Sequence, residues 1–303
     1  MPLQKGTLWN CIIATTERAR ASGVLLPAPT TYTFVEDSGI FFFVRVLTSL
    51  QRKDEAREEQ VAVASPAKKV NPFFPPEEDL TVADITDTHV AILNKFNVVD
   101  HHLLIVTRRF EDQEMLLNAN DFEAMWTCMA EFNGLGFYNG GRKAGASQQH
   151  KHLQIVPLPL APEGPSIPIA PLLDQKRRKN INIIPAFSFL HAFQWLEPEV
   201  VKSPGLATEK TFEFYCTMVK NVGMTPPAAD KQTRQTLPYC FLMTREWMLL
   251  VPRSREYVED ISINSLAFAG SFFVRTEKQL ERLKSFGPLR ALQSVAVSNK
   301  QPN

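Results

Sequence analysis

Two histidines and a glutamine occupy alternate positions near the middle of the chain, at His150, His152 and Gln154. Successive side chains of a β-strand point to opposite faces, so the apolar run 150–156, read as a strand, places all three on one face. Leu153 and its apolar neighbours then supply the core face. A neutral imidazole is a competent nucleophile toward phosphorus near neutral pH. The spacing therefore predicts a polar strand face that is free for chemistry.

A glycine-rich loop, GGRKAGAS from Gly140 to Ser147, comes directly before this strand. Its three glycines let the backbone approach a ligand closely and turn several N–H groups toward an anion. Arg142 and Lys143 add positive charge. A phosphate-binding loop that leads into a strand with histidines suggests phosphoryl or nucleotidyl chemistry.

Three other types of site use similar residues: a metal site, a Walker A loop and a dinucleotide-binding loop. An HxH pair also matches two ligands of a metal site, for which His101 or His102 is the only obvious further donor. No cysteine or carboxylate pattern completes such a set. The loop is not a Walker A motif, because Ala146 stands where the lysine must be and a strand follows instead of a helix. The dinucleotide fingerprint GxGxxG is absent too.

Several elements are predicted around this segment. Short apolar runs predict strands at 40–47, 90–93, 102–106 and 137–139. An apolar stripe with helical spacing predicts a helix that opens at Asn120, with Glu123 in capping-box position, and ends at Gly134. The charged run 51–60 and the proline-bearing run 65–78 are expected to be mostly solvated loop.

A proline-rich segment, 157–171, holds six prolines in fifteen residues and is predicted to be an extended connector. It divides the chain into an N-terminal half, 1–160, which carries the candidate site, and a C-terminal half, 161–303. LIVTR at 104–108 is echoed by LLVPR at 249–253, and a helical-looking stretch at 264–273 echoes the earlier helix. We therefore expect a degenerate repeat without the histidines, within one compact unit.

Composition limits the classes of function. The 303 residues include 44% hydrophobic and 21% charged residues, which excludes disorder and coiled-coil rods. A net charge of +1 disfavours a nucleic-acid partner. There is no apolar run of about 18 residues and no signal-peptide core, so a membrane partner is not expected. The four widely spaced cysteines suit a reducing cytoplasm.

The string HKHLQ resembles the His-x-His-x-Gln motif of the transferase branch of the histidine-triad superfamily. The longer string FYNGGRKAGASQQHKHLQ is similar to diadenosine tetraphosphate (Ap4A) phosphorylases, also called ATP adenylyltransferases, as are NPFFPPEEDL and the segments 92–113 and 239–254. The resemblance covers roughly residues 25–275. The galactose-phosphate uridylyltransferases share the spacing of Asn139, Ser147 and His152.

The resemblance implies a fold and a reaction. The fold would be α+β and histidine-triad-like, an antiparallel sheet with packed helices in two related halves of one chain. His152 would attack the α-phosphorus of a bound nucleotide, and inorganic phosphate would then release ADP. His150 would orient His152 through its backbone carbonyl. Gln154 would favour transfer over hydrolysis, because an amide does not act as a proton donor at pH 7.

The resemblance also implies binding residues. Ser147 and the N–H groups of residues 145–148 would hold phosphate oxygens, and Asn94, Lys95 and Asn139 would hold the adenosine end. Lys53 resembles the family's phosphate-binding lysine, although its context here is QRKDEA; Arg52 or Lys5 are the alternatives. Arg253 would reach the distal phosphates. The substrate-binding set is therefore Lys53, Asn94, Lys95, Asn139, Gly145, Ala146, Gln148 and Arg253.

The expected partners are small molecules only: Ap4A, ATP, ADP and phosphate. No zinc is expected, because the paired cysteines of the uridylyltransferases are missing. Mg²⁺ would travel with the polyphosphate, since it prefers phosphate oxygens and water to a protein cage. The alternatives to phosphorolysis are adenylylsulfate-using chemistry, hydrolysis of the same dinucleotides, and a nucleotide-binding sensor without turnover.

Overall fold

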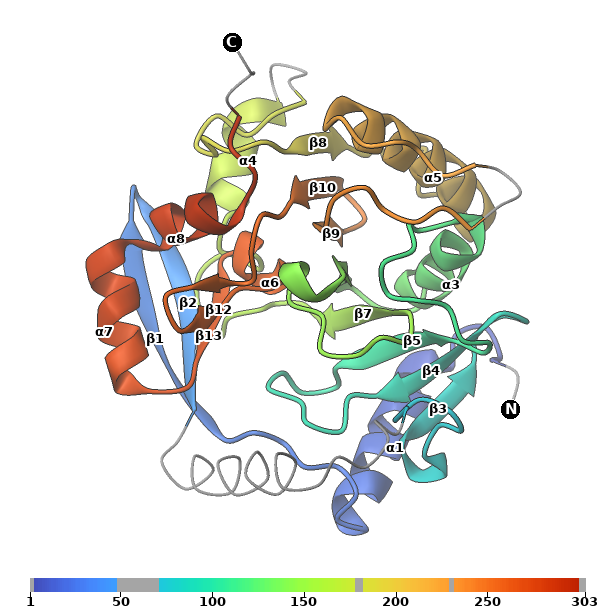
Figure 1. Ribbon diagram of the computed structural model, residues 1–303. Helices are drawn as coiled ribbons and strands as arrows, with labels where there is room; N and C mark the ends of the chain where they lie inside the picture. Colours follow the sequence, from blue (N-terminus) through green and yellow to red (C-terminus); the bar gives the residue numbers. More distant parts are fainter. Residues whose placement is uncertain (1–2, 48–70, 178–181, 229–231, 300–303) are drawn as a thin grey trace.

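An eight-stranded antiparallel sheet is the centre of the computed structural model, which describes residues 3–47, 71–177, 182–228 and 232–299. The α+β fold that we expected is confirmed (Figure 1). In spatial order the strands are β3 (Thr81–Asp84), β4 (His89–Leu93), β5 (Leu103–Thr107), β7 (His152–Pro157), β6 (Gly134–Gly140), β9 (Tyr239–Met243), β10 (Trp247–Pro252) and β8 (Ala192–Trp195). Strands from the two parts of the chain meet at β6 and β9.

A second, three-stranded sheet lies beside the first. The strands β1 (Thr30–Asp37) and β2 (Ile40–Leu47) form a hairpin, and β13 (Ser271–Val274) pairs in parallel with β2. The hairpin turns at Ser38 and Gly39, both with positive φ, the backbone geometry that matches the strand twist. A two-stranded ribbon, β11 (Tyr257–Val258) and β12 (Ile261–Ser262), precedes β13.

Helices cover the two faces of the large sheet. On one face α1 (Leu8–Ala21), α3 (Ala119–Met129) and α5 (Pro204–Asn221) contribute to one apolar cluster. On the other face the small sheet packs with α6 (Ser265–Phe268), α7 (Glu277–Phe286) and α8 (Pro288–Val295). Within the described residues, the remaining helices are α4 (Ala170–Arg177) and the 3₁₀ turns η1 (Glu78–Leu80) and η2 (Arg142–Ala144).

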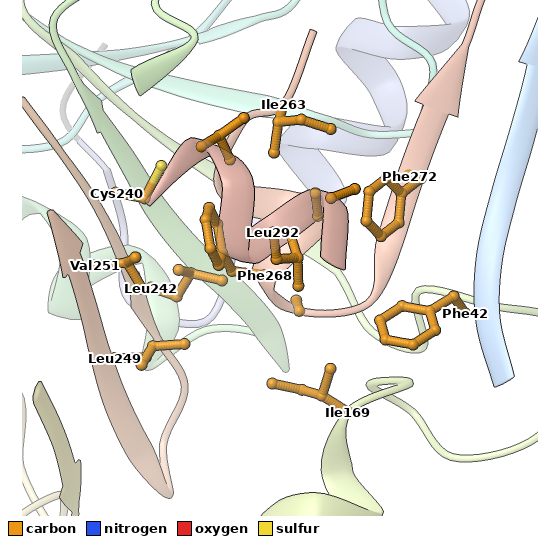
Figure 2. Packing of buried hydrophobic residues seen from close by; sticks show 14 of the residues in the cluster. Phe42, Ile169, Cys240, Leu242, Leu249, Val251, Ile263, Phe268, Phe272 and Leu292 are labelled. Carbon is orange, nitrogen blue, oxygen red and sulfur yellow. The ribbon is translucent and has the colours of Figure 1, made fainter. Parts of the chain in front are cut away.

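Figure 2 shows the packing on this second face, where Leu242, Leu249 and Val251 of β9 and β10 lie on one side of Phe268. The second-face cluster extends over β6 but does not include β4 and β5. There a small separate cluster forms, in which Phe73 packs with apolar residues of β4 and β5. The sheet face between the two clusters carries His152 and Gln154, and this gap positions the candidate site.

Several predicted elements differ from those observed. The strand at 40–47 and the helix after residue 118 are confirmed, but the helix is capped by Asn118 and Asp121, not by Asn120 and Glu123. The strand predicted at 150–156 begins only at His152. The helical-looking stretch 264–273 is helical only at Ser265–Phe268, and Gly270, with φ of 89°, lies just before β13.

Of the predicted connector 157–171, residues 158–169 form no regular structure, whereas Pro157 ends β7 and α4 begins at Ala170. The charged run 51–60 lies outside the described residues. None of the helices in the described ranges combines the length and the hydropathy needed to cross a membrane.

Candidate active site

His152 is the first residue of β7, and its ring is buried. Its Nδ1 lies 2.8 Å from the carbonyl oxygen of His150, so Nδ1–H donates to that carbonyl and Nε2 carries the free lone pair. This is the contact that we expected from His150. Burial lowers the pKa of the His152 imidazole to about 4, so the ring is neutral at pH 7. Within the described residues Nε2 has no hydrogen-bond partner, and His152 lines a cavity.

Gln113 fixes the backbone at His152. The His152 N–H donates to Gln113 Oε1 at 2.8 Å. Gln113 Nε2 in turn donates to the carbonyls of Asn139 at 3.0 Å and His152 at 3.2 Å. The pairing of β6 with β7 ends at Phe137 and Gln154. Beyond that pair the strands separate, and the Gln113 side chain takes the place of the backbone hydrogen bonds between them. Gln113 lies in the quoted segment 92–113, but nothing in its spacing predicts the role.

Gln154 is oriented by a chain of hydrogen bonds that starts at the backbone. The Phe96 N–H donates to Asn94 Oδ1 at 3.2 Å, which leaves Asn94 Nδ2 to donate to His102 Nδ1 at 3.2 Å. His102 Nε2–H can then donate to Gln154 Oε1 at 3.0 Å. The amide hydrogens of Gln154 are therefore available to the cavity. Burial lowers the pKa of His102 to about 4, which keeps this ring neutral.

The His150 ring is not part of the cavity lining and holds a neighbouring loop instead. Its Nε2 donates to the Thr107 carbonyl at 2.8 Å, and its Nδ1 accepts from Asn71 Nδ2 at 2.9 Å. Asn71 Oδ1 accepts the N–H of Phe73 at 3.0 Å. The Phe73 ring then lies 5.1 Å from the His152 ring. Sequence reasoning missed Asn71 and Phe73, although both belong to the quoted string NPFFPPEEDL.

The cavity has a volume of about 370 Å³ and brings most of the predicted residues together. One end is apolar, with walls from η1, β4, β5 and the 71–76 loop, and suits a planar base. The predicted residues in the lining are Asn94, Lys95, Asn139, Gly145, Ala146, Ser147, Gln148, His152 and Gln154. His101, the other histidine considered, is not among them; its Nδ1 lies 3.1 Å from Thr16 Oγ1.

The loop 145–148 contributes fewer free N–H groups than we expected. Gly145 N–H donates to the Arg142 carbonyl at 2.9 Å and Ala146 N–H to the Gly141 carbonyl at 3.3 Å. In the described part of the chain, the N–H groups of Ser147 and Gln148 donate to no protein group and remain available for an anion. Gly145 has φ of 95°, and a Cβ there would lie 2.9 Å from Asn264 Cβ, so this tight loop requires glycine.

Two cations and an amide at the cavity have protein partners. Lys95 Nζ pairs with the Glu77 carboxylate at 2.8 Å. Arg45, which sequence reasoning missed, donates to Ser271 Oγ at 3.0 Å and to the Leu160 carbonyl at 2.9 Å. Asn139 Oδ1 accepts from the N–H and the hydroxyl of Ser265. The Arg45 and Asn139 contacts join the cavity to the small sheet and to α6.

Arg253 requires a correction. It was expected at the distal phosphates, but its side chain is 1% exposed and does not line the cavity. Its guanidinium donates to carbonyls that include those of Val295, Arg255 and Ile263, so it is structural. Lys53 and Arg52 lie outside the described residues. Lys5 is exposed just before α1, away from the cavity lining.

Where the structure is described, no group of three or more histidine, cysteine or acidic side chains has an arrangement that could hold a metal ion. His102, considered as a third metal donor, hydrogen-bonds Asn94 and Gln154.

Family models match both parts of the chain. Residues 1–175 match a model described as the Ap4A phosphorylase N-terminal domain, and residues 185–298 match one described as the ATP adenylyltransferase C-terminal domain.

Two curated proteins of Saccharomyces cerevisiae are similar in sequence. Diadenosine 5',5'''-P1,P4-tetraphosphate phosphorylase 2 is 26% identical over 270 residues, which are 80% of this chain and 78% of that protein. Protein APA1 is 24% identical over 240 residues, which are 70% of this chain and 71% of its own.

Among solved structures, yeast Ap4A phosphorylase Apa2 in complex with Ap4A aligns with a TM-score of 0.72 at 23% identity. The alignment covers 99% of this chain and 100% of that one. Apa2 in complex with AMP gives a TM-score of 0.73 with the same identity and coverage. At this level of identity the likeness establishes the fold.

Proposed function

The chain belongs to the Ap4A phosphorylase (ATP adenylyltransferase) family, and we propose that it converts Ap4A and phosphate to ATP and ADP through an adenylyl group carried on His152. The observation that carries the proposal is the state of the His152 ring. Its Nδ1–H is bound to the His150 carbonyl, and burial keeps the ring neutral, so Nε2 offers a lone pair toward the cavity.

In the first step the lone pair of His152 Nε2 forms a bond to the α-phosphorus. The bond from that phosphorus to the bridging oxygen breaks, and ATP leaves with the bonding electrons. The ring becomes positively charged while it carries AMP. The His150 carbonyl, which accepts from Nδ1–H, stabilises that charge without taking the proton.

Negative charge on the transferring phosphoryl group is stabilised by donors on both sides. The free N–H groups of Ser147 and Gln148 come from the loop, and the Gln154 amide comes from the strand. These donors are held in place before substrate arrives, so little reorganisation is needed during the reaction. Asn94 and Lys95 lie beside the apolar end, where the adenosine would bind.

In the second step an oxygen of inorganic phosphate attacks the same phosphorus. The bond to Nε2 breaks, its electrons return to the ring, and ADP is released. Gln154 cannot donate a proton at pH 7, which favours phosphate, already an anion, over water as the acceptor. Mg²⁺ would enter with the polyphosphate, because it prefers phosphate oxygens and water as ligands.

A phosphate-dependence assay tests this function. We expect purified protein to consume Ap4A only when phosphate is added and to form ATP and ADP in equal amounts, as read by chromatography. Formation of AMP and ATP in phosphate-free buffer would identify a hydrolase instead. Binding of Ap4A without consumption under both conditions would identify a sensor.

A further inference from the structure

The turn 71–74 is held against the two histidines of the motif by the side chain of Asn71. Its Oδ1 accepts the N–H of Phe73 at 3.0 Å, and its backbone carbonyl accepts the N–H of Phe74 at 3.3 Å. Its Nδ2 donates to His150 Nδ1 at 2.9 Å. One asparagine therefore shapes the turn and also attaches it to the residue two positions before the nucleophile.

Backbone groups at both ends fix the direction of these hydrogen bonds. The Thr107 carbonyl can only accept, so His150 Nε2 carries the proton and Nδ1 is the acceptor. The N–H of Phe73 can only donate, so it meets Oδ1 of Asn71 and leaves Nδ2 for His150. Burial lowers the pKa of His150, which keeps the ring neutral and this acceptor available at pH 7.

The aromatic ring that this turn carries lies against the nucleophile. Phe73 is 8% exposed, packs with apolar residues of β4 and β5, and lines the cavity. Its ring centroid is 5.1 Å from that of His152, with the two planes tilted by 58°. The bond from Nδ1–H to the His150 carbonyl holds only one point of the His152 ring. Contact with Phe73 therefore restricts the plane of that ring and covers it.

We propose that Asn71 is a positioning residue for the reaction: through the His150 ring it holds Phe73 against His152, so that Nε2 keeps one direction and water stays away from the ring. His150 joins the two parts, because its carbonyl binds the His152 Nδ1–H and its ring binds Asn71. The first histidine of the motif thus acts without contacting substrate, since its ring does not line the cavity. The proposal deepens the proposed function, and its kinetic test rests on that function.

A double-mutant cycle on kcat for Ap4A phosphorolysis tests whether Asn71 acts through Phe73. We expect Asn71→Ala to lower kcat about tenfold, the effect of one lost orienting hydrogen bond. KM for Ap4A should stay near the wild-type value, because Asn71 does not line the cavity. In the Phe73→Ala background the same change should cause no further fall. The matched control is Phe74→Ala, in the same turn but 63% exposed and outside the cavity lining, which should keep the wild-type kcat.

Titration of the His152 ring tests the exclusion of water without any turnover. Burial lowers the pKa of this ring to about 4. In Asn71→Ala and in Phe73→Ala, nitrogen-15 NMR should show this pKa rise toward 6.5 by at least about one unit, because water that reaches the ring stabilises its charged form. Phe74→Ala should leave it unchanged. The ring stays neutral at pH 7 in every variant, so the fall in kcat comes from orientation and not from protonation.

The charged neighbours of His152 are the same in all of these variants. Among the described residues, the titratable groups that face its ring are His150, directly before β7, and His102, directly before β5. The cavity lining adds three charged side chains, Arg45, Lys95 and Glu77. The turn 71–74 contains no titratable side chain. A changed pKa of His152 therefore reports the entry of water and not a lost charge.

A tenfold loss that is repeated in the Phe73→Ala background would overturn the proposal, because Asn71 would then not act through Phe73. So would a wild-type kcat or an unchanged His152 pKa in Asn71→Ala. A wild-type protein that does not consume Ap4A would overturn the proposed function instead, and the ring titration would still decide whether Asn71 keeps water from His152.

Discussion

The two halves of the chain each contain a buried histidine whose Nδ1 lies 2.8 Å from the carbonyl two residues earlier, at His152 and at His191. Only the surroundings of Nε2 differ. Nε2 of His191 accepts the N–H of Ile184 at 2.7 Å, so its lone pair is used. Nε2 of His152 faces the cavity. A bound Nδ1 is therefore insufficient for nucleophilic chemistry, and the second half of the chain shows a ring with no free nitrogen.

His102 was considered in the sequence only as a metal ligand, but in the structure it orients Gln154. Its position between Asn94 and Gln154 fixes which end of the Gln154 amide faces the cavity. We predict that His102→Ala lowers kcat for Ap4A phosphorolysis about tenfold, the effect of one lost orienting hydrogen bond. Steady-state kinetics on the purified variant measures the fall.

The adjacent His101 gives the matched control, because it contacts Thr16 and Trp9 away from the cavity. His101→Ala should keep the wild-type kcat. Wild-type turnover in His102→Ala would show that Gln154 does not depend on this ring.

At the scale of elements, a buried lysine directly before β7 contacts α3 on the face opposite the cavity. Lys151 Nζ lies 2.6 Å from Asp121 Oδ2 and 3.0 Å from the Leu116 carbonyl, with both charged side chains fully buried. Asp121 also accepts the N–H of Asn118 and lies 3.1 Å from His89 Nε2. Lys151 stands between the two histidines of the motif, so this ion pair fixes the strand that presents His152.

We predict that Lys151→Met lowers the free energy of unfolding by roughly 3–5 kcal/mol, because it leaves the Asp121 carboxylate buried without its cation. Urea denaturation measures the loss. Lys143→Met, at an exposed lysine of η2, should leave the unfolding free energy unchanged. A loss below about 1 kcal/mol in Lys151→Met, the usual value of an exposed pair, would contradict this account.

The Lys151–Asp121 pair also determines in which direction the stability of the fold changes with pH. Burial alone would raise the pKa of Asp121, but the Lys151 charge and the His89 bond outweigh it and lower this pKa to about 2. The unfolded chain has the ordinary value near 3.8. The stabilisation is therefore complete above about pH 4 and is lost as the pH falls through 2.

The helix α3 shows what the sequence could and could not predict about elements. Its apolar stripe predicted the helix correctly, because burial of one face has a clear period. Its start was predicted two residues late, because Asn120 with Glu123 has the same spacing as Asn118 with Asp121. The ion pair between Lys151 and Asp121 favours the earlier start. This is a tertiary contact, which a local sequence pattern does not contain.

At the scale of the whole molecule, the site lies where two apolar clusters on one sheet face fail to meet. Asn139, the loop 145–148, His152 and Gln154 are close in sequence, and their motif spacing was sufficient to predict that they lie at one cavity. Arg45, Phe73 and Phe272 line the same cavity although they come from distant elements. Arg253, which was expected there, is buried in the core instead. Tertiary packing decides these placements: Arg45 and Phe272 belong to the small sheet, whereas Phe73 packs on β4 and β5. Local sequence spacing does not contain this information.

The central claim is that His152 Nε2 carries AMP during turnover, and trapping the adduct tests it most directly. Protein is incubated with Ap4A in phosphate-free buffer, digested under alkaline conditions, and mapped by mass spectrometry. We predict one AMP group on His152, stable in alkali and labile in acid as a phosphorus–nitrogen bond is, and none in His152→Gly. An adduct on His150, Ser147 or a lysine, or wild-type turnover by His152→Gly, would contradict the account.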